Sequence, residues 1–166
     1  MSVKWMVSLV LTAVMGATGQ QPAAAPQATL ILKTVDGRSL TLAAQDFDKL
    51  PQVKVSAKDH EERTHEYAGM KLRDVLTQAG VATGHDLRAK EMADYVVVEA
   101  ADGYRVVFSL AELDPEFSDT QVIVAESADG QPLGAKEGPL RLVVPGDKRP
   151  ARWVRMVTII SVMRAQ

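Results

Sequence analysis

Three Asp-Gly pairs constrain this chain more than any other feature of its sequence. Each lies between short runs in which apolar and polar residues alternate. Asp-Gly favours the two-residue turns of β-hairpins, because such turns require positive φ angles. The sequence therefore predicts a protein built largely from antiparallel hairpins. The three pairs are Asp36-Gly37, Asp102-Gly103 and Asp129-Gly130.

Runs of strand length surround these turns. The three consecutive valines from Val96 to Val98 are typical of a strand that is covered on both faces. The expected strands, about eight in number, are residues 29–35, 38–42, 52–57, 95–100, 105–108, 121–126, 140–144 and 154–162.

One segment has the spacing of an amphipathic helix. Four apolar residues from Leu72 to Ala79 recur at i, i+3, i+4 and i+7, and Gly80 follows as a C-terminal cap. We expect a helix over residues 71–79 and a helical turn over residues 46–50. The expected fold class is α+β, with mixed, largely antiparallel sheets and a few short helices.

The first 25 residues have the layout of a signal peptide and leader. Lys4 precedes an apolar run that is shorter than the roughly 20 residues of a membrane span, and small residues follow it. Cleavage near Gly19 or Ala25 would leave a single domain over residues 28–164. This interpretation predicts a periplasmic or secreted bacterial protein, and an uncleaved amino-terminal anchor is the alternative.

Composition excludes several classes of function. The 166 residues carry a net charge of −2, so the chain lacks the positive field of a nucleic-acid-binding protein. It has no cysteine, which excludes disulfides, thiolate metal sites and a cysteine nucleophile. Ser109 and Ser127 lie in no nucleophile elbow, and no glycine-rich loop has the context of a phosphate site.

A histidine-rich segment resembles a zinc-protease helix only superficially. His60 and His65 are five residues apart, whereas a zinc helix needs a separation of four to place both on one face. No third ligand is evident from the sequence. The alternative is a solvated, charged loop over residues 59–65.

The carboxy-terminal third carries the most informative motif. Residues 138–146 read Gly-Pro-Leu-Arg-Leu-Val-Val-Pro-Gly, and Arg152-Trp153 follow. Upstream, residues 67–76 read Tyr-Ala-Gly-Met-Lys-Leu-Arg-Asp-Val-Leu, and Asp102-Gly103-Tyr104 form a further match. In order and spacing these segments resemble the molybdopterin-binding domain of the sulfite oxidase family. The resemblance implies that family's molybdopterin-binding fold.

The sequence departs from this family at the metal. In catalytic members a cysteine thiolate binds molybdenum just before the position of Tyr67, and this chain has no cysteine. Asp59 and His60 lie nearby as candidate substitutes. The family's Lys-Trp pair is Arg152-Trp153 here. This change keeps a positive charge but replaces the compact lysine ammonium group with the planar arginine guanidinium group.

A cluster of cations accompanies this motif. Five basic residues fall between residues 141 and 155, and the resemblance implies that they bind the phosphate of a molybdopterin or another anionic small molecule. The alternative is that Arg141 and Arg155 lie on solvent-facing sides of strands, while Lys148 and Arg149 lie at the tip of a loop. The candidate cofactor-binding residues are Arg141, Lys148, Arg149, Arg152 and Trp153.

Three functions remain open at this point. The first is an exported binding or accessory module without the family's cysteine-ligated molybdenum chemistry. The second is a periplasmic molybdopterin-dependent oxidoreductase with an atypical metal site. The third is a protein-interaction subunit beside a periplasmic redox partner. The sequence does not decide whether the chain is an enzyme.

Overall fold

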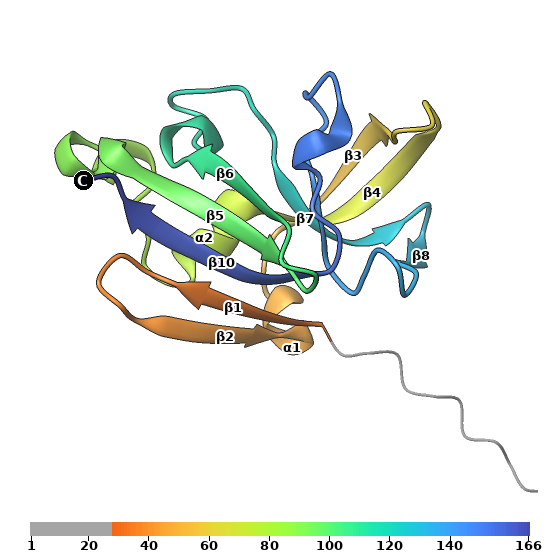
Figure 1. Cartoon of the computed structure of the whole chain (residues 1–166), viewed down its shortest axis with the longest axis horizontal. Coiled ribbons are helices and arrows are strands. Elements are labelled where there is room, and N and C mark those ends of the chain that lie inside the picture. Colours follow the sequence, from red (N-terminus) through yellow and green to blue (C-terminus); the bar gives the residue numbers. More distant parts are fainter. Residues whose placement is uncertain (1–27) are drawn as a thin grey trace, which may run out of the picture.

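The computed structural model describes residues 28–166, drawn in colour in Figure 1. The expected signal peptide and leader lie outside the described residues. Within residues 28–166, no helix is both long enough and apolar enough to cross a membrane.

The first sheet has the strand order β2-β1-β10-β5-β6. Strands β1 and β10 are parallel, and the other neighbours are antiparallel. Its two hairpins, β1–β2 and β5–β6, turn at the expected Asp-Gly pairs, where Gly37 and Gly103 have φ angles of 83° and 84°. The expectation of two-residue loops is wrong at both: Thr34 bonds to Arg38 and Ala100 to Tyr104, so each loop has three residues and its aspartate has no positive φ. The bounds are β1 (Thr29–Lys33), β2 (Ser39–Ala43), β5 (Asp94–Ala100), β6 (Arg105–Ser109) and β10 (Val157–Arg164).

The second sheet is antiparallel throughout, with the order β3-β4-β7-β8 and β9 also paired with β7. The third Asp-Gly pair makes the β7–β8 turn, where Asp129 and Gly130 have φ angles of 52° and 75°. Two consecutive positive angles are what such a turn requires. The bounds are β3 (Gln52–Lys58), β4 (Thr64–Lys71), β7 (Ile123–Ala128), β8 (Gln131–Pro132) and β9 (Arg141–Val143).

The helices are short. The expected helix appears as α2 (Leu72–Thr77), continued by hydrogen-bonded turns to Gly80. The expected helical turn begins two residues earlier, as α1 (Ala44–Phe47), because the Asp46 carboxylate accepts the Ala43 N–H. The 3₁₀ turns are η1 (Gly84–Asp86), η2 (Ala89–Ala93), η3 (Ala111–Leu113) and η4 (Pro150–Arg152).

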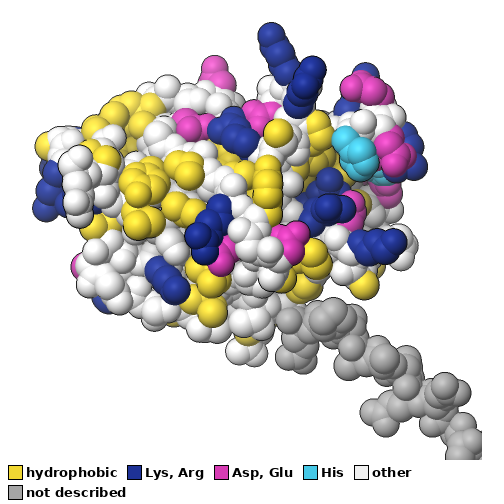
Figure 2. All heavy atoms as spheres, in the orientation of Figure 1, with side chains coloured by type: hydrophobic (Ala, Val, Ile, Leu, Met, Phe, Trp, Pro, Cys, Tyr) yellow, Lys and Arg dark blue, Asp and Glu magenta, His cyan; other side chains and the backbone are white. Residues whose placement is uncertain are grey.

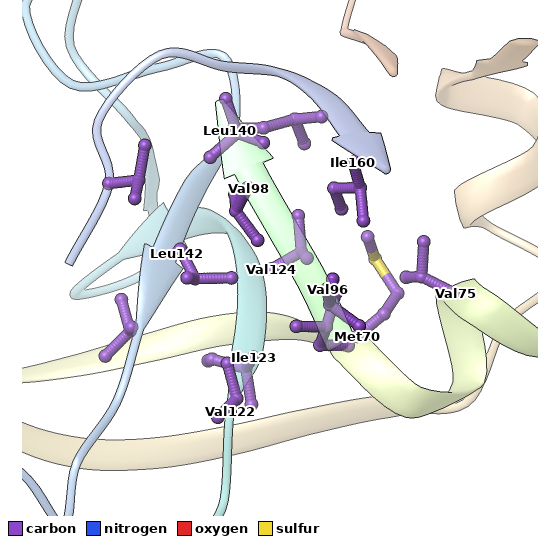
Figure 3. Close-up of a cluster of buried hydrophobic side chains, with 14 of the residues drawn as sticks. Met70, Val75, Val96, Val98, Val122, Ile123, Val124, Leu140, Leu142 and Ile160 are labelled. Atoms are coloured by element: carbon purple, nitrogen blue, oxygen red, sulfur yellow. The ribbon is translucent and has the colours of Figure 1, made fainter. Parts of the chain in front are cut away.

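The two sheets and α2 enclose one apolar core (Figure 3). Figure 3 draws Val96 of β5 beside Met70, and Val98 farther along the same strand on the side of Leu142. The expectation that β5 is covered on both faces is wrong. Its residues alternate between buried and half-buried, because its second face, which includes Val97, belongs to the outer surface of the sheet. The α+β class with largely antiparallel pairing is confirmed.

Candidate functional site

An open cleft of about 380 Å³ lies where the β5–β6 turn meets β9 and the segment around η4. These elements are far apart in the sequence, and the fold brings their ends together. Its walls combine aromatic rings, cations and acidic groups. The lining residues that matter below are His60, Tyr104, Glu137, Arg141, Trp153 and Arg155.

Arg141 is a buried cation in the wall of this cleft. Its side chain is only 6% exposed, because β9 pairs with β7 inside the second sheet. The guanidinium carbon lies 5.4 Å from the ring centroids of both Tyr67 and Trp153, and Nη1 donates to Glu137 Oε1 at 2.5 Å. Within residues 28–166 the buried Nε has no hydrogen-bond partner. An unsatisfied donor on a buried cation is costly, and it favours an added acceptor at this position.

Trp153 forms the apolar floor beside Arg141. Its ring is buried, its Nε1 donates to the Val144 carbonyl at 3.0 Å, and it meets Tyr67 edge-on with centroids 5.6 Å apart. Tyr104 stands at the rim instead, 49% exposed, with its hydroxyl donating to the Ala151 carbonyl. Trp153 is therefore fixed in place, whereas Tyr104 presents an accessible ring.

The guanidinium of Arg152 already donates its hydrogen bonds to two carboxylates of the protein. Its Nε and Nη2 donate to the Asp147 carboxylate at 2.9 and 2.6 Å, and its Nη1 donates to Glu112 at 2.8 Å. These bonds, that to Asp147 above all, raise the pKa of Arg152. The guanidinium also covers the ring of Phe108, at 4.6 Å. This arginine holds the loop before it against the β6 end of the first sheet.

The remaining expected cations lie at the surface. Lys148 and Arg149 are exposed on the loop between β9 and η4, and Figure 2 shows basic side chains projecting from that loop. Arg155 is exposed as well and lines the cleft. Of the candidate cofactor-binding residues, the fold brings Arg141 and Trp153 together and leaves the other three outside this contact.

The histidine-rich segment contains a second cluster, which the sequence did not predict. His65 lies on β4 between two carboxylates: Nδ1 is 2.6 Å from Asp129 Oδ2 and Nε2 is 3.3 Å from Asp59 Oδ2. Asp129 lies 64 residues away, in the β7–β8 turn, and it reaches His65 because β4 pairs with β7. Figure 2 shows histidine among acidic and basic side chains at this end of the molecule.

Asp59 is buried in the β3–β4 turn, and both of its carboxylate oxygens accept hydrogen bonds there. Oδ1 accepts the N–H groups of Glu61 and Arg63, and Oδ2 accepts the Arg63 side chain. Burial by itself would raise the pKa of Asp59, but these hydrogen bonds outweigh burial and lower it. The residue is thus a structural cap of the turn and not a solvated charge.

The His65 cluster makes stability depend on pH. The bond to Asp129, offset in part by burial, raises the pKa of His65, and the same bond lowers the pKa of Asp129. The contribution of charged His65 to the free energy of unfolding is therefore complete below the ordinary histidine pKa. It is lost as the pH rises through the raised pKa of His65 in the folded protein. The contribution of Asp129 and Asp59 is present above the ordinary aspartate pKa and is lost in acid.

The described residues offer no ready metal site. Within residues 28–166, no three His, Cys, Asp or Glu side chains converge as metal ligands would. Asp59 spends both oxygens on the turn, and His60 stands exposed beside Glu61.

Fold and cleft together define a class: a two-sheet α+β domain with a buried arginine and a buried tryptophan in the wall and floor of an open cleft. The model of the oxidoreductase molybdopterin binding domain family matches residues 23–166, so this chain belongs to that family. A search of curated proteins found no match.

Among solved structures, the fold is similar to the sulfane dehydrogenase SoxCD from Paracoccus pantotrophus. The TM-score is 0.63 at 19% sequence identity, over 81% of this chain and 38% of that chain. The likeness confirms the expected fold. The chain spans well under half of that protein's length.

Proposed function

We propose that this protein is an exported member of its family that binds an anionic, pterin-like small molecule as a binding or accessory module, without cysteine-ligated molybdenum chemistry. The observation that carries the proposal is Arg141, a buried cation with an unsatisfied Nε in the wall of a cleft. Trp153 fixes its guanidinium from one side, and exposed Arg155 adds a second positive charge.

Half of the molybdopterin group fits the residues present. A phosphate in the cleft could accept from Arg155 and from the guanidinium of Arg141, whose unsatisfied Nε would become available by a small movement of the cleft wall, and Tyr104 offers a ring face for a flat heterocycle. The metal half does not fit. When bound, the dithiolene of the pterin holds molybdenum, and the family's thiolate ligand has no counterpart in this cysteine-free chain. We therefore assign ligand contacts to Arg141, Trp153, Tyr104 and Arg155, and we route no reaction step through a metal.

Arg152, Lys148 and Arg149 take a lesser part in this proposal. Arg152 anchors the loop through Asp147 and Glu112, so its substitution would affect binding through the loop. Lys148 and Arg149 would add only long-range attraction, which salt screens.

The first experiment is calorimetric titration of a phosphate-bearing pterin into the exported protein. We expect Arg141→Ala to weaken binding about tenfold or more, because a charge-assisted hydrogen bond contributes about 1.5–3 kcal/mol. Arg105→Ala is the matched control, since Arg105 is an exposed arginine paired with Glu99 on β6. Equal losses in both variants, or no binding by the wild type, would refute the assignment.

A metal assay separates this proposal from the oxidoreductase alternative. Protein made in a host that supplies molybdenum cofactor is analysed for metal and by native mass spectrometry. We expect no stoichiometric molybdenum. One molybdenum per chain would establish an atypical metal site and overturn the accessory role.

A further inference from the structure

The sheet edge at β2 lacks the protection that both edges of the second sheet have. In the described part of the chain, β2 is the last strand of the first sheet, and its outer side has no neighbouring strand (Figure 1). Sheet edges are normally protected by charges, proline or very short strands. The second sheet follows that rule, since β3 carries Lys54 and Lys58 and β8 is two residues long with Pro132. Strand β2 reads Ser-Leu-Thr-Leu-Ala and has none of these devices.

The backbone of β2 presents free hydrogen-bonding groups outward. The Thr34 N–H donates to the Arg38 carbonyl, so every second residue from Arg38 onward bonds toward β1. The backbone groups of Ser39, Thr41 and Ala43 therefore point away from the sheet. The Ala43 N–H confirms this direction, because it is bound from outside the hairpin by Asp46.

The side chains of β2 leave an apolar surface at the same edge. Leu42 is buried, but Leu40 on the same face is 36% exposed. A groove of about 430 Å³ runs past Leu40, between β2 and the end of α2, and Thr77 and Ala79 line its other side. A strand added beside β2 would cover Leu40 and the mouth of this groove.

We propose that β2 pairs antiparallel with β2 of a second copy of this chain, across a twofold axis at Thr41. In that register Thr41 faces Thr41 of the partner copy, Leu40 lies beside Leu42, and Ser39 lies beside Ala43. Each Thr41 donates to and accepts from its counterpart, and each Ser39 N–H donates to the opposite Ala43 carbonyl. The Ala43 N–H needs no partner, because Asp46 already binds it.

Strand sequence and charge both favour this occupant. The pairing is isologous and closes after two copies, whereas pairing β2 with the β6 edge would propagate without closing. Threonine opposite threonine is a favourable cross-strand pair, and no like charges oppose each other along the five residues. At the ends of the paired strands, Arg38 of one copy would lie near Asp46 of the other, but Arg38 already pairs with Asp36 and Asp46 with Lys49, so the pairing avoids repulsion there and needs no new ion pair.

Sedimentation velocity and light scattering of the intact protein test this inference, which does not depend on the proposed ligand. We expect a dimer at micromolar concentration and at least a tenfold weaker dimer for Thr41→Pro, which removes the central outward N–H groups. Val107→Pro is the matched control. Val107 is an exposed position on β6, the opposite edge strand of the same sheet. Every second residue of this strand, counted from Tyr104, bonds to β5, so the backbone groups of Val107 also point outward.

A second experiment, based on charge pairing, applies if circular dichroism shows that Thr41→Pro does not fold. Thr41→Lys and Thr41→Glu should each dimerise more weakly than the wild type, and an equimolar mixture should form the mixed dimer in preference to either pure one. A monomeric wild type, a Thr41→Pro dimer as tight as the wild type, a dimer lost only in Val107→Pro, or a mixture without preference would overturn the proposal.

Discussion

Gly69→Ala should be among the most destabilising single-methyl additions in this protein. Gly69 lies on β4 opposite Ala125 of β7, next to an irregularity in the strand register. A Cβ atom at this position would lie 2.1 Å from the Val124 carbonyl oxygen and 2.6 Å from the Ala125 Cα. Both contacts are with backbone, so no side chain can rotate away. Strand β7 would have to shift, although it also pairs with β8 and β9 and carries core residues.

The expected cost is at the upper end of the range for overpacking, about 3 kcal/mol or more. For a domain of this size, that cost lowers the melting temperature by about 6–12 °C. Urea titration followed by circular dichroism measures the free energy of unfolding, with Gly134→Ala as the matched control because a Cβ there meets no atom within 4 Å. If Gly69→Ala and Gly134→Ala were equally stable, the close packing of β4 against β7 would be refuted.

Two further perturbations test other parts of the fold. His65→Gln should flatten the dependence of stability on pH: the wild type should lose free energy of unfolding as pH rises above about 6.5, and the variant should lose less, as measured by urea titration across that range. A wild-type curve that stays flat above neutrality would show that His65 is not held charged. Leu76→Ala should cost about 2–5 kcal/mol, because Leu76 is fully buried, whereas Lys136→Ala should change stability by less than about 0.5 kcal/mol. Equal effects would contradict the orientation of α2.

Local chemistry explains which elements were predictable. Each Asp-Gly pair forms its turn through neighbouring residues alone, so all three turns appear where the sequence places them. The helix at Leu72 follows from its own apolar spacing. The short helix α1 was misplaced by two residues, because its start depends on the hydrogen bond that the Ala43 N–H donates to the Asp46 carboxylate rather than on a pattern of apolar residues.

The candidate site shows where such reasoning stops. The motif identified Arg141 and Trp153, but their sequence positions do not reveal that Arg141 is buried between Trp153 and Tyr67. Arg152 looked equivalent to Arg141 in the sequence, yet ion pairs with Asp147 and Glu112 occupy its donors. Burial and pairing of a charge depend on residues from other strands.

By itself, the sequence determined the three Asp-Gly turns, the fold family and the missing thiolate, because turn chemistry, motif order and composition are properties of the chain. It did not predict strand β4 or the β3–β4 hairpin. Only the tertiary structure decided that Arg141 keeps a free donor, which carboxylates hold His65, and that the edge at β2 lies open. The first two features arise when β4, β7 and β9 align in register, and that register joins residues as far apart as His65 and Asp129. Sequence patterns report faces and turns, whereas side-chain partners across a sheet are set by the packing of the whole domain.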